Sequence, residues 1–270
     1  MFFRSLLLMH AASHVYHIPP EYSASSLDAG GCRAARTVFH QGDCGACAAF
    51  ASASSLGMRL CRTEDFLPSP FRLFDCVSTC GNGSTLRQTG DALAQGIPDV
   101  DASPQAFGVG CEYAPARALV MYGYIVGGFD SAMKLDLMLF GPAVVVLHAG
   151  DDFSLYTGDT VYHHDNHHRD PNSAHSMVVV GWGSDPEPHW VVQNSWGGRW
   201  GDRGMARIAL PTFTHLYAWR TREEVALEVA VLVAYFALLL VAVVALAVWL
   251  PREVEGGGRA PFWCREVELW

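Results

Sequence analysis

Seven of the eight cysteines lie between residues 32 and 111, and this cluster constrains the fold more than any other feature. An odd number of cysteines fits three disulfides and one free thiol in a lumenal or extracellular domain. Two of them, Cys44 and Cys47, form a Cys-Gly-Ala-Cys motif. The motif has three interpretations: a redox dithiol, half of a metal site, or a nucleophile with its oxyanion donor. The sequence has no second CxxC at a matching distance, which argues against thiolate-bound zinc.

The segment after Cys47 is rich in alanine and predicts a helix that packs tightly inside a domain. Cys47 would then lie at or near the helix N-terminus, where the helix dipole and unpaired amides favour a thiolate. This position suits a nucleophile and a redox pair equally well, so it does not decide between them.

Two downstream segments favour a nucleophile. His175 comes just before an apolar run that predicts a buried strand, and Asn194 follows a second short strand. A thiolate nucleophile needs a base, and the base needs a group that orients it. An Asn oxygen can accept a hydrogen bond from an imidazole N–H, and Trp196 could cover that bond. A redox dithiol needs none of these residues.

Three motifs resemble the segments of papain-like cysteine peptidases that carry the catalytic residues. They are Gln41-Gly-Asp-Cys-Gly-Ala-Cys47, Ala174-His175 with Val-Val-Val-Gly-Trp-Gly, and Gln193-Asn194-Ser195-Trp196-Gly197. His175 and Asn194 follow Cys47 by 128 and 147 residues, which matches the family spacing. The resemblance covers about residues 18–210. It implies an α+β fold with a helical lobe, a β-barrel-like lobe and a cleft for an extended peptide.

The resemblance implies a role for each matching residue. Cys47 would be the nucleophile, and His175 would be its base. Asn194 would orient the imidazole, and Gln41 would donate a hydrogen bond to the oxyanion. Substrate contacts would come from Gly83, Ala174 and Trp196. No cofactor and no metal are implied.

The resemblance also implies the disulfides and a branch of the family. The pair Cys32–Cys61 and the segment 151–164 resemble the cathepsin B-like branch. The broader family pattern pairs Cys44 with Cys80 and Cys76 with Cys111, while a rival Cys76–Cys80 pair stays open. Cys47 is left free in either case. The interval between Cys80 and Cys111 is too short for the occluding loop of cathepsin B, so we expect an endopeptidase rather than a carboxydipeptidase.

Two features depart from the family pattern. Ala48 stands where a large aromatic residue usually follows the nucleophile. An unfilled gap there would cost about 3–5 kcal/mol of stability, unless a neighbouring side chain has adapted. The segment 163–168, His-His-Asp-Asn-His-His, could bind zinc or copper or sense endosomal pH, and a solvated loop is the preferred interpretation.

A run of 22 residues over 229–250 has no charge, Pro or Gly and predicts a transmembrane helix. A buried core helix is the alternative. The predicted organisation is a signal peptide or truncated leader over 1–17, a peptidase domain over 18–215, a juxtamembrane linker over 216–228, the span over 229–250 and a tail over 251–270. Flanking arginines and the expected disulfides favour a lumenal (endo-lysosomal or secretory) or extracellular domain with a cytosolic tail.

The leading hypothesis is therefore a membrane-anchored cysteine endopeptidase that acts on peptide or protein substrates. The alternative is a catalytically weak relative that serves as a membrane-tethered binding protein. A net charge of −9 with a single lysine, Lys134, gives no reason to expect a nucleic-acid partner.

Overall fold

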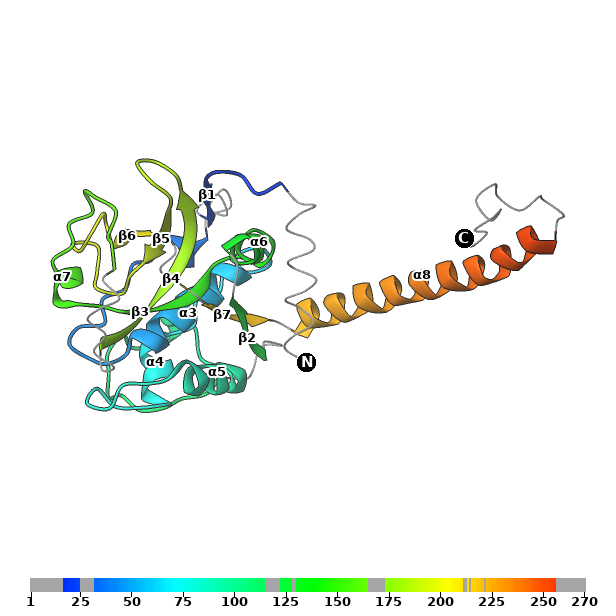
Figure 1. The fold of residues 1–270 in the computed structure, drawn as a ribbon. Coiled ribbons are helices and arrows are strands. Elements are labelled where there is room, and N and C mark those ends of the chain that lie inside the picture. The colour runs from blue at the N-terminus through cyan, green and yellow to red at the C-terminus, as the bar shows by residue number, and fades with distance from the viewer. Residues whose placement is uncertain are drawn as a thin grey trace, which may run out of the picture. The chain divides into compact units, whose positions relative to one another are not determined.

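The computed structural model describes residues 17–24, 32–114, 122–127, 130–164, 173–210, 213, 215–220 and 222–255 (Figure 1). The chain divides into two compact units, Met1–Arg222 and Glu223–Trp270. The sheet and most of the helices belong to the first unit. Of the leader expected over 1–17 only His17 is described, and of the tail expected over 251–270 only 251–255 are described, as the end of α8 (Arg222–Glu255).

An antiparallel sheet of seven strands forms the frame of the first unit within the described residues. The strand order is β2-β7-β3-β4-β5-β6, and β1 pairs with β4. The strands are β1 (Tyr22–Ser23), β2 (Tyr122–Gly127), β3 (Ala143–His148), β4 (Ala174–Gly183), β5 (His189–Gln193), β6 (Met205–Ala209) and β7 (His215–Arg220).

Alternate side chains of β4 enter two different hydrophobic cores. Val178 and Val180 belong to one core, whereas Met177 and Val179 belong to the other. This separation follows from the two-residue period of a strand, which sends successive side chains to opposite faces. The first core contains residues of α2 (Arg33–Arg36), α3 (Cys47–Leu60), α4 (Pro70–Asp75), α5 (Leu86–Gln95) and the 3₁₀ helix η2 (Val100–Ala102), and the second contains residues of α6 (Asp130–Phe140) and α7 (Asp151–Ser154). The α+β class predicted from the sequence is confirmed.

The helix α3 is buried along its length, as its small residues predict. Every residue from Ala48 to Leu60 is buried. A Cβ added at Gly57 would lie 2.8 Å from a methyl group of Leu67 and 2.9 Å from the Cβ of Ala34, so the helix approaches its neighbours as closely as packing allows. Ala48 is 2% exposed, so the position at which the family usually has a large aromatic residue lies in the interior of this protein. Its effect on stability stays a prediction.

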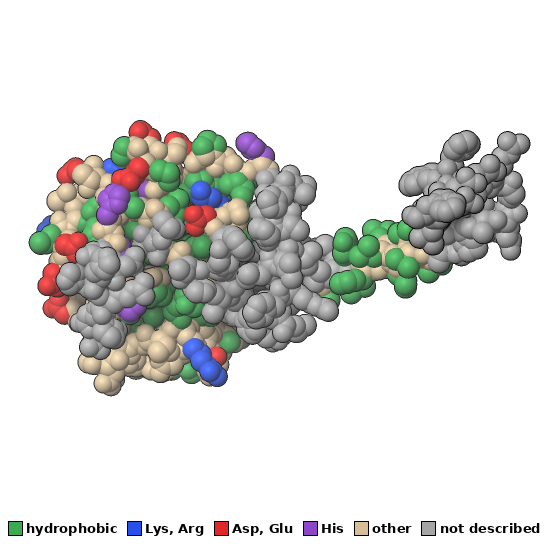
Figure 2. All heavy atoms as spheres, viewed as in Figure 1, with side chains coloured by type: hydrophobic (Ala, Val, Ile, Leu, Met, Phe, Trp, Pro, Cys, Tyr) green, Lys and Arg blue, Asp and Glu red, His purple; other side chains and the backbone are tan. Residues whose placement is uncertain are grey.

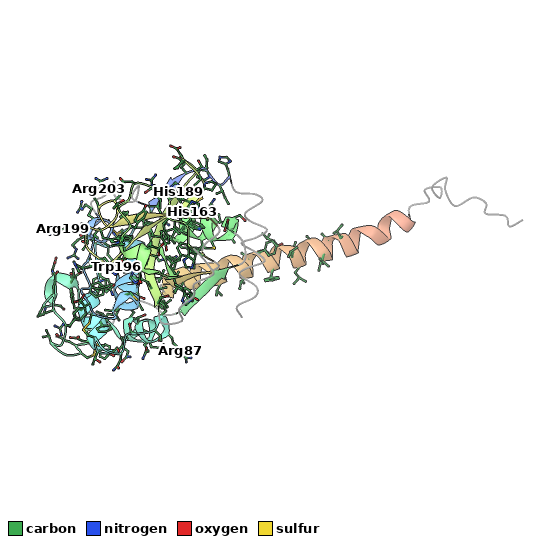
Figure 3. All side chains as sticks on the ribbon, turned by 60° about the vertical axis from the view of Figure 1, so that its left-hand side comes forward. Arg87, His163, His189, Trp196, Arg199 and Arg203 are labelled. Atoms are coloured by element: carbon green, nitrogen blue, oxygen red, sulfur yellow. A yellow bond between two sulfur atoms is a disulfide. The ribbon has the colours of Figure 1, made fainter. Side chains whose placement is uncertain are left out.

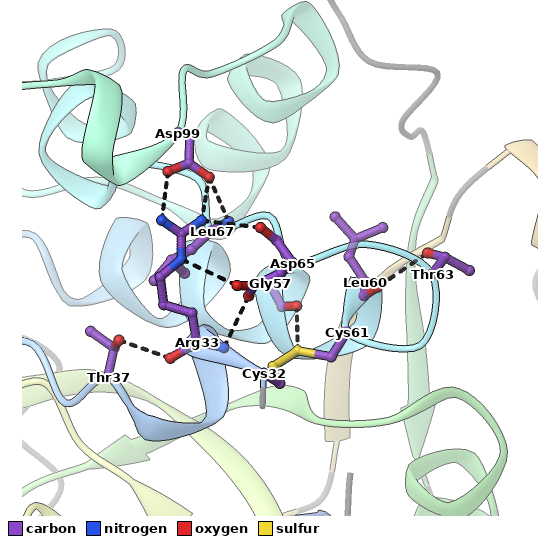
Figure 4. Close-up of a disulfide and its surroundings, with 10 residues drawn as sticks. All are labelled: Cys32, Arg33, Thr37, Gly57, Leu60, Cys61, Thr63, Asp65, Leu67 and Asp99. Atoms are coloured by element: carbon purple, nitrogen blue, oxygen red, sulfur yellow. Dashed lines mark hydrogen bonds and ion pairs between the residues drawn. A yellow bond between two sulfur atoms is a disulfide. The ribbon is translucent and has the colours of Figure 1, made fainter. Parts of the chain in front are cut away.

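Three disulfides tie the helical part together. They are Cys32–Cys61, Cys44–Cys80 and Cys76–Cys111, which are the pairs that the family resemblance implies; the rival Cys76–Cys80 bond is not formed. Figure 4 shows the first of them joining the start of α2 to the end of α3. Beside it, Arg33 donates to the Asp99 carboxylate at 2.7 Å, which fastens the same corner to the segment before η2.

The strand β7 extends the sheet beyond the predicted domain boundary. It pairs with β2 from Tyr122 to Gly127 and contacts β3 where Val144 faces Tyr217. Leu216 and Ala218 are fully buried in the second core. The linker expected over 216–228 therefore begins too early, because β7 obtains its main partner from a strand about 90 residues away that local sequence cannot reveal.

The helix α8 (Arg222–Glu255) contains the long apolar run. Its large apolar side chains that are described, such as Val229 and Leu246, are exposed (Figure 2). The helix continues past the run at both ends, through charged residues at 222–228 and 252–255. Among the described residues no helix combines the length and apolar character needed to cross a membrane, so the structure does not support the span expected over 229–250.

Candidate active site

The packing of α3 on β4 places Cys47 and His175 at the same end of the two elements. Near the end of α3, Ser55 Oγ and Arg59 Nε donate to the carbonyl of Pro142 at 2.9 and 2.8 Å. Pro142 precedes β3, whose first residue faces Val179 of β4. The C-terminal half of α3 is thus fixed beside the middle of β4.

From this fixed point, the distance along α3 back to Cys47 is close to the distance along β4 back to His175. From Ser55 back to Cys47 the helix covers about 12 Å, at 1.5 Å per residue. From Val179 back to His175 the strand covers about 13 Å, at 3.3 Å per residue. Between these points, Ala51 lines the same small cavity as Ser176–Val178 of β4, so the elements stay in contact along the way.

Gln41 links the loop before Cys47 to the segment that carries Asn194. Its backbone N–H donates to the carbonyl of Ser195 at 2.8 Å, and Ser195 Oγ donates to Gln41 Oε1 at 2.5 Å. On the other side, Gln41 Nε2 donates to the carbonyl of Cys44 at 2.8 Å. The side chain is buried, and its Nε2 has a second N–H for another acceptor.

The hydrogen bond between His175 and Asn194 fixes the tautomer of the imidazole. Asn194 Oδ1 lies 2.7 Å from His175 Nε2 and accepts the backbone N–H of Ser195 at 2.8 Å. The second contact identifies this atom as the amide oxygen, which can only accept. His175 Nε2 must therefore carry the proton, and in the neutral ring Nδ1 keeps its lone pair.

Trp196 stacks on the His175 ring, with 4.5 Å between the ring centroids and 30° between the planes. His175 and Asn194 are both buried. Burial lowers the pKa of His175 to about 4, and the hydrogen bond that His175 donates to Asn194 offsets only part of this effect. The resting imidazole is thus neutral near pH 7, which is the form that can accept a proton.

Cys47 is the one free cysteine in the described part of the chain, and it is half-buried at the first position of α3. Ala46, at the N-cap, supplies no side-chain acceptor to the first turn. The first amides of α3 therefore lack a capping acceptor, and the positive end of the helix dipole lies at Cys47. In the described residues no hydrogen bond joins the Cys47 thiol to His175. Such pairs are often looser in ligand-free forms.

The three residues expected to contact substrate lie around these groups. Trp196 covers His175, and Ala174 is exposed at the start of β4, directly before His175. Gly83 lies against the Cys44–Cys47 loop, because a Cβ added at Gly45 would come within 3.0 Å of the Gly83 Cα. Ser195 was not among the residues predicted from the sequence, because its bond to Gln41 joins residues 154 positions apart.

The histidine-rich segment lies only partly within the described residues. His163 Nε2 is 2.8 Å from a carboxylate oxygen of Glu187, and both side chains are largely exposed. The remainder, 165–168, is outside the described residues. No group of three or more potential metal ligands gathers among the residues that are described.

Comparison with known proteins places this arrangement in a family. The model of the papain family cysteine proteases matches residues 23–215, which is most of the chain. The chain belongs to this family. Two papain-like structures have similar folds: procathepsin B S9 of Trypanosoma congolense (TM-score 0.66, 22% identity, 78% of this chain and 80% of that one) and bromelain of Ananas comosus in complex with the E64 inhibitor (TM-score 0.59, 20% identity, 76% and 100%). At these identities the likeness concerns the papain-like fold alone.

Among curated proteins, this papain-family chain is 37% identical over 192 residues to cathepsin K of Mus musculus, covering 64% of this chain and 55% of the relative. Cathepsin K of Gallus gallus is 34% identical over 181 residues, covering 63% and 54%. The chain thus spans about half the length of the curated relatives it matches. The cathepsin B-like branch expected from the sequence is not specifically supported, because these relatives carry the name cathepsin K.

Proposed function

We propose that this chain is a cysteine endopeptidase of the papain family, with Cys47 as nucleophile and His175 as its base. The observation that carries the proposal is the hydrogen-bonded path from His175 through Asn194 and Ser195 to Gln41, together with the free thiol at the start of α3. A structural disulfide domain has no need for a buried histidine held in one tautomer.

The chemistry follows from the proton positions. His175 Nδ1, which has the lone pair, takes the Cys47 proton, and the thiolate attacks the scissile carbonyl. The second N–H of Gln41 Nε2 and the backbone N–H of Cys47 donate to the oxyanion. His175 returns its proton to the leaving amine, and water then hydrolyses the thioester. Asn194 keeps Nε2 protonated throughout, so that Nδ1 faces the reaction.

An extended peptide is the substrate that we infer. Gly83 is beside the nucleophile loop and would offer backbone hydrogen bonds, while Ala174 and Trp196 would border the reacting bond. The three disulfides support a lumenal or extracellular location. The proposal does not assign the chain to a branch of the family. The Cys32–Cys61 disulfide resembles the cathepsin B pattern, whereas the curated relatives carry the name cathepsin K. Membrane anchoring is also left out, because the structure does not support it.

Hydrolysis of a fluorogenic peptide library by the full chain tests the proposal. We expect turnover that requires Cys47 and His175, and that is lost in Cys47→Ala and in His175→Ala. Cys264→Ala is the matched control, since it removes the other cysteine that the predicted disulfides leave unpaired, and it should retain full activity. A folded wild-type chain with intact disulfides that cleaves no peptide would refute the proposal.

A further inference from the structure

A second concave site lies at the opposite end of β4 from His175. This groove has a volume of about 480 Å³ and is formed by the segment around β1 and by the β4–β5 hairpin, with Glu21, Trp182, Asp185 and His189 in its lining. From His175 to Gly183, another lining residue, β4 covers about 26 Å. Figure 3 likewise shows His189 apart from Trp196, which marks the catalytic site.

His189 brings a buried acceptor to this groove. The residue is 5% exposed, and its Nδ1 lies 2.7 Å from the carbonyl oxygen of Glu187. A carbonyl can only accept, so Nδ1 carries the proton and Nε2 of the neutral ring has a lone pair. Within the described residues Nε2 has no hydrogen-bond partner.

The residue that pairs with His189, Gly183, has no side chain to block His189 Nε2. Gly183 pairs with His189 across the hairpin and also lines the groove. A Cβ added at Gly183 would lie 2.8 Å from His189 Nε2. The glycine therefore leaves free space beside the lone pair, where any larger residue would close it.

The aromatic donors of the groove are directed elsewhere. Tyr22 donates its hydroxyl to the carbonyl of Leu137 at 3.4 Å, and Trp182 Nε1 donates to the carbonyl of Pro19 at 3.0 Å. Their rings stack on each other with centroids 4.8 Å apart, so they offer the groove apolar surface.

The charge of the groove is negative. Glu21 and Asp185 are exposed carboxylates, and no Lys or Arg is among the described residues that line it. Lys134 of α6 lies over the Trp182 ring, 5.4 Å from its centroid, and is not part of the lining. The two carboxylates supply negative charge and the unpartnered Nε2 of His189 supplies an acceptor, so the groove suits a ligand that only donates hydrogen bonds.

We propose that this groove binds an organic cation with several N–H donors, a primary ammonium or a guanidinium. Glu21 and Asp185 supply the charge, His189 Nε2 accepts one N–H, and the Tyr22 ring packs against the aliphatic stem. A metal ion fits less well, since no group of three or more potential metal ligands gathers among the described residues. The cation could belong to a Lys or Arg side chain of a protein or to a free polyamine.

Calorimetric titration of the full-length Cys47→Ala chain, which cannot digest itself, tests this site. The probe is agmatine, which carries a guanidinium and an ammonium, and we expect binding at millimolar concentration. Glu21→Gln and Asp185→Asn should each weaken it about tenfold. Asp91→Asn, an exposed carboxylate on α5, is the control that removes the same charge elsewhere and should leave the affinity unchanged.

Two further measurements test where the cation binds and whether it comes from a protein side chain or a free amine. Gly183→Ala should abolish binding without loss of peptidase activity when placed in the chain that retains Cys47. A stronger signal with N-acetylarginine amide than with spermidine identifies a protein side chain as the ligand, and the reverse identifies a free amine. The proposal fails if agmatine does not bind, if Asp91→Asn weakens binding as much as Asp185→Asn, or if the uncharged N-(4-hydroxybutyl)urea binds equally well.

Discussion

At the level of single residues, Gln41 combines two roles, one structural and one proposed in catalysis. Its Oε1 and backbone N–H hold the segment that carries Asn194, and its Nε2 is the proposed donor to the oxyanion. One N–H of Nε2 is already bonded to the Cys44 carbonyl, and this bond orients the amide before substrate arrives. The proposed oxyanion donor is therefore held in place before substrate binds, which is the condition under which such a donor contributes most.

Gln41→Ala should separate peptide hydrolysis from thiol reactivity. We expect kcat for peptides to fall by about 10²–10³-fold, because one oxyanion donor is lost. Alkylation of Cys47 by iodoacetamide develops no oxyanion, so its rate should fall far less. Gln95→Ala, an exposed glutamine on α5, is the control for both assays. Equal losses in the two reactions of Gln41→Ala would show that Gln41 supports the thiol rather than the oxyanion.

His175 should make the fold less stable in acid. Its folded pKa of about 4 is below the usual value of 6.5, so the unfolded chain binds more protons between these values. Stability therefore decreases as pH falls through this window, by up to about 3 kcal/mol from this group. Urea unfolding of Cys47→Ala at pH 7 and pH 4 measures the change.

His175→Gln in the same background isolates that contribution, because all other titrating groups are shared. The double variant should lose less stability between pH 7 and pH 4 than Cys47→Ala does. An identical pH dependence in the two proteins would mean that His175 is not buried in its neutral form.

At the level of elements, a buried ion pair fixes the C-terminal end of α3. Arg59 Nη2 lies 3.1 Å from an Asp136 carboxylate oxygen of α6, with side chains 2% and 0% exposed. The same guanidinium donates to the carbonyls of Gly141 and Pro142. Because α3 carries Cys47 at its other end, this anchor helps to set where Cys47 lies along β4.

Asp136→Asn should be far more damaging than the loss of an exposed ion pair. The change removes the Asp136 charge from beside a buried guanidinium, and we expect a loss of about 3–5 kcal/mol in the free energy of unfolding. Asp202→Asn breaks the Arg203 pair, whose side chains are 90% and 65% exposed, and should cost less than about 0.5 kcal/mol. Similar losses in the two variants would contradict the anchoring role.

The sequence predicted the elements whose patterns are local. The Ala-rich run after Cys47 indicated a buried helix, and the apolar run after His175 indicated a buried strand; both are present. The strand β7 was missed because its partner β2 is far away in the chain. The Arg59–Asp136 and Gln41–Ser195 contacts were not predicted for the same reason, because a polar residue in a sequence does not indicate which distant residue it will contact.

For the whole molecule, the family follows from three short motifs and is shown by a match over residues 23–215. The finer statements made from the sequence had a weaker basis. The cathepsin B-like branch depended on one disulfide and one loop segment, and the membrane span depended on the length and composition of one apolar run. The roles of Cys47, His175, Asn194 and Gln41 remain predictions, supported by the geometry that gathers them.

Reaction of the full chain with a peptidyl epoxide tests the central claim most directly. An activated thiolate in a peptide cleft should add one inhibitor mass per chain, located on Cys47 by peptide mapping, and Cys47→Ala should stay unlabelled. His175→Ala should slow the labelling strongly, because the base is lost. A folded wild-type chain with three intact disulfides that remains unlabelled, or that is labelled equally after His175→Ala, would contradict the account.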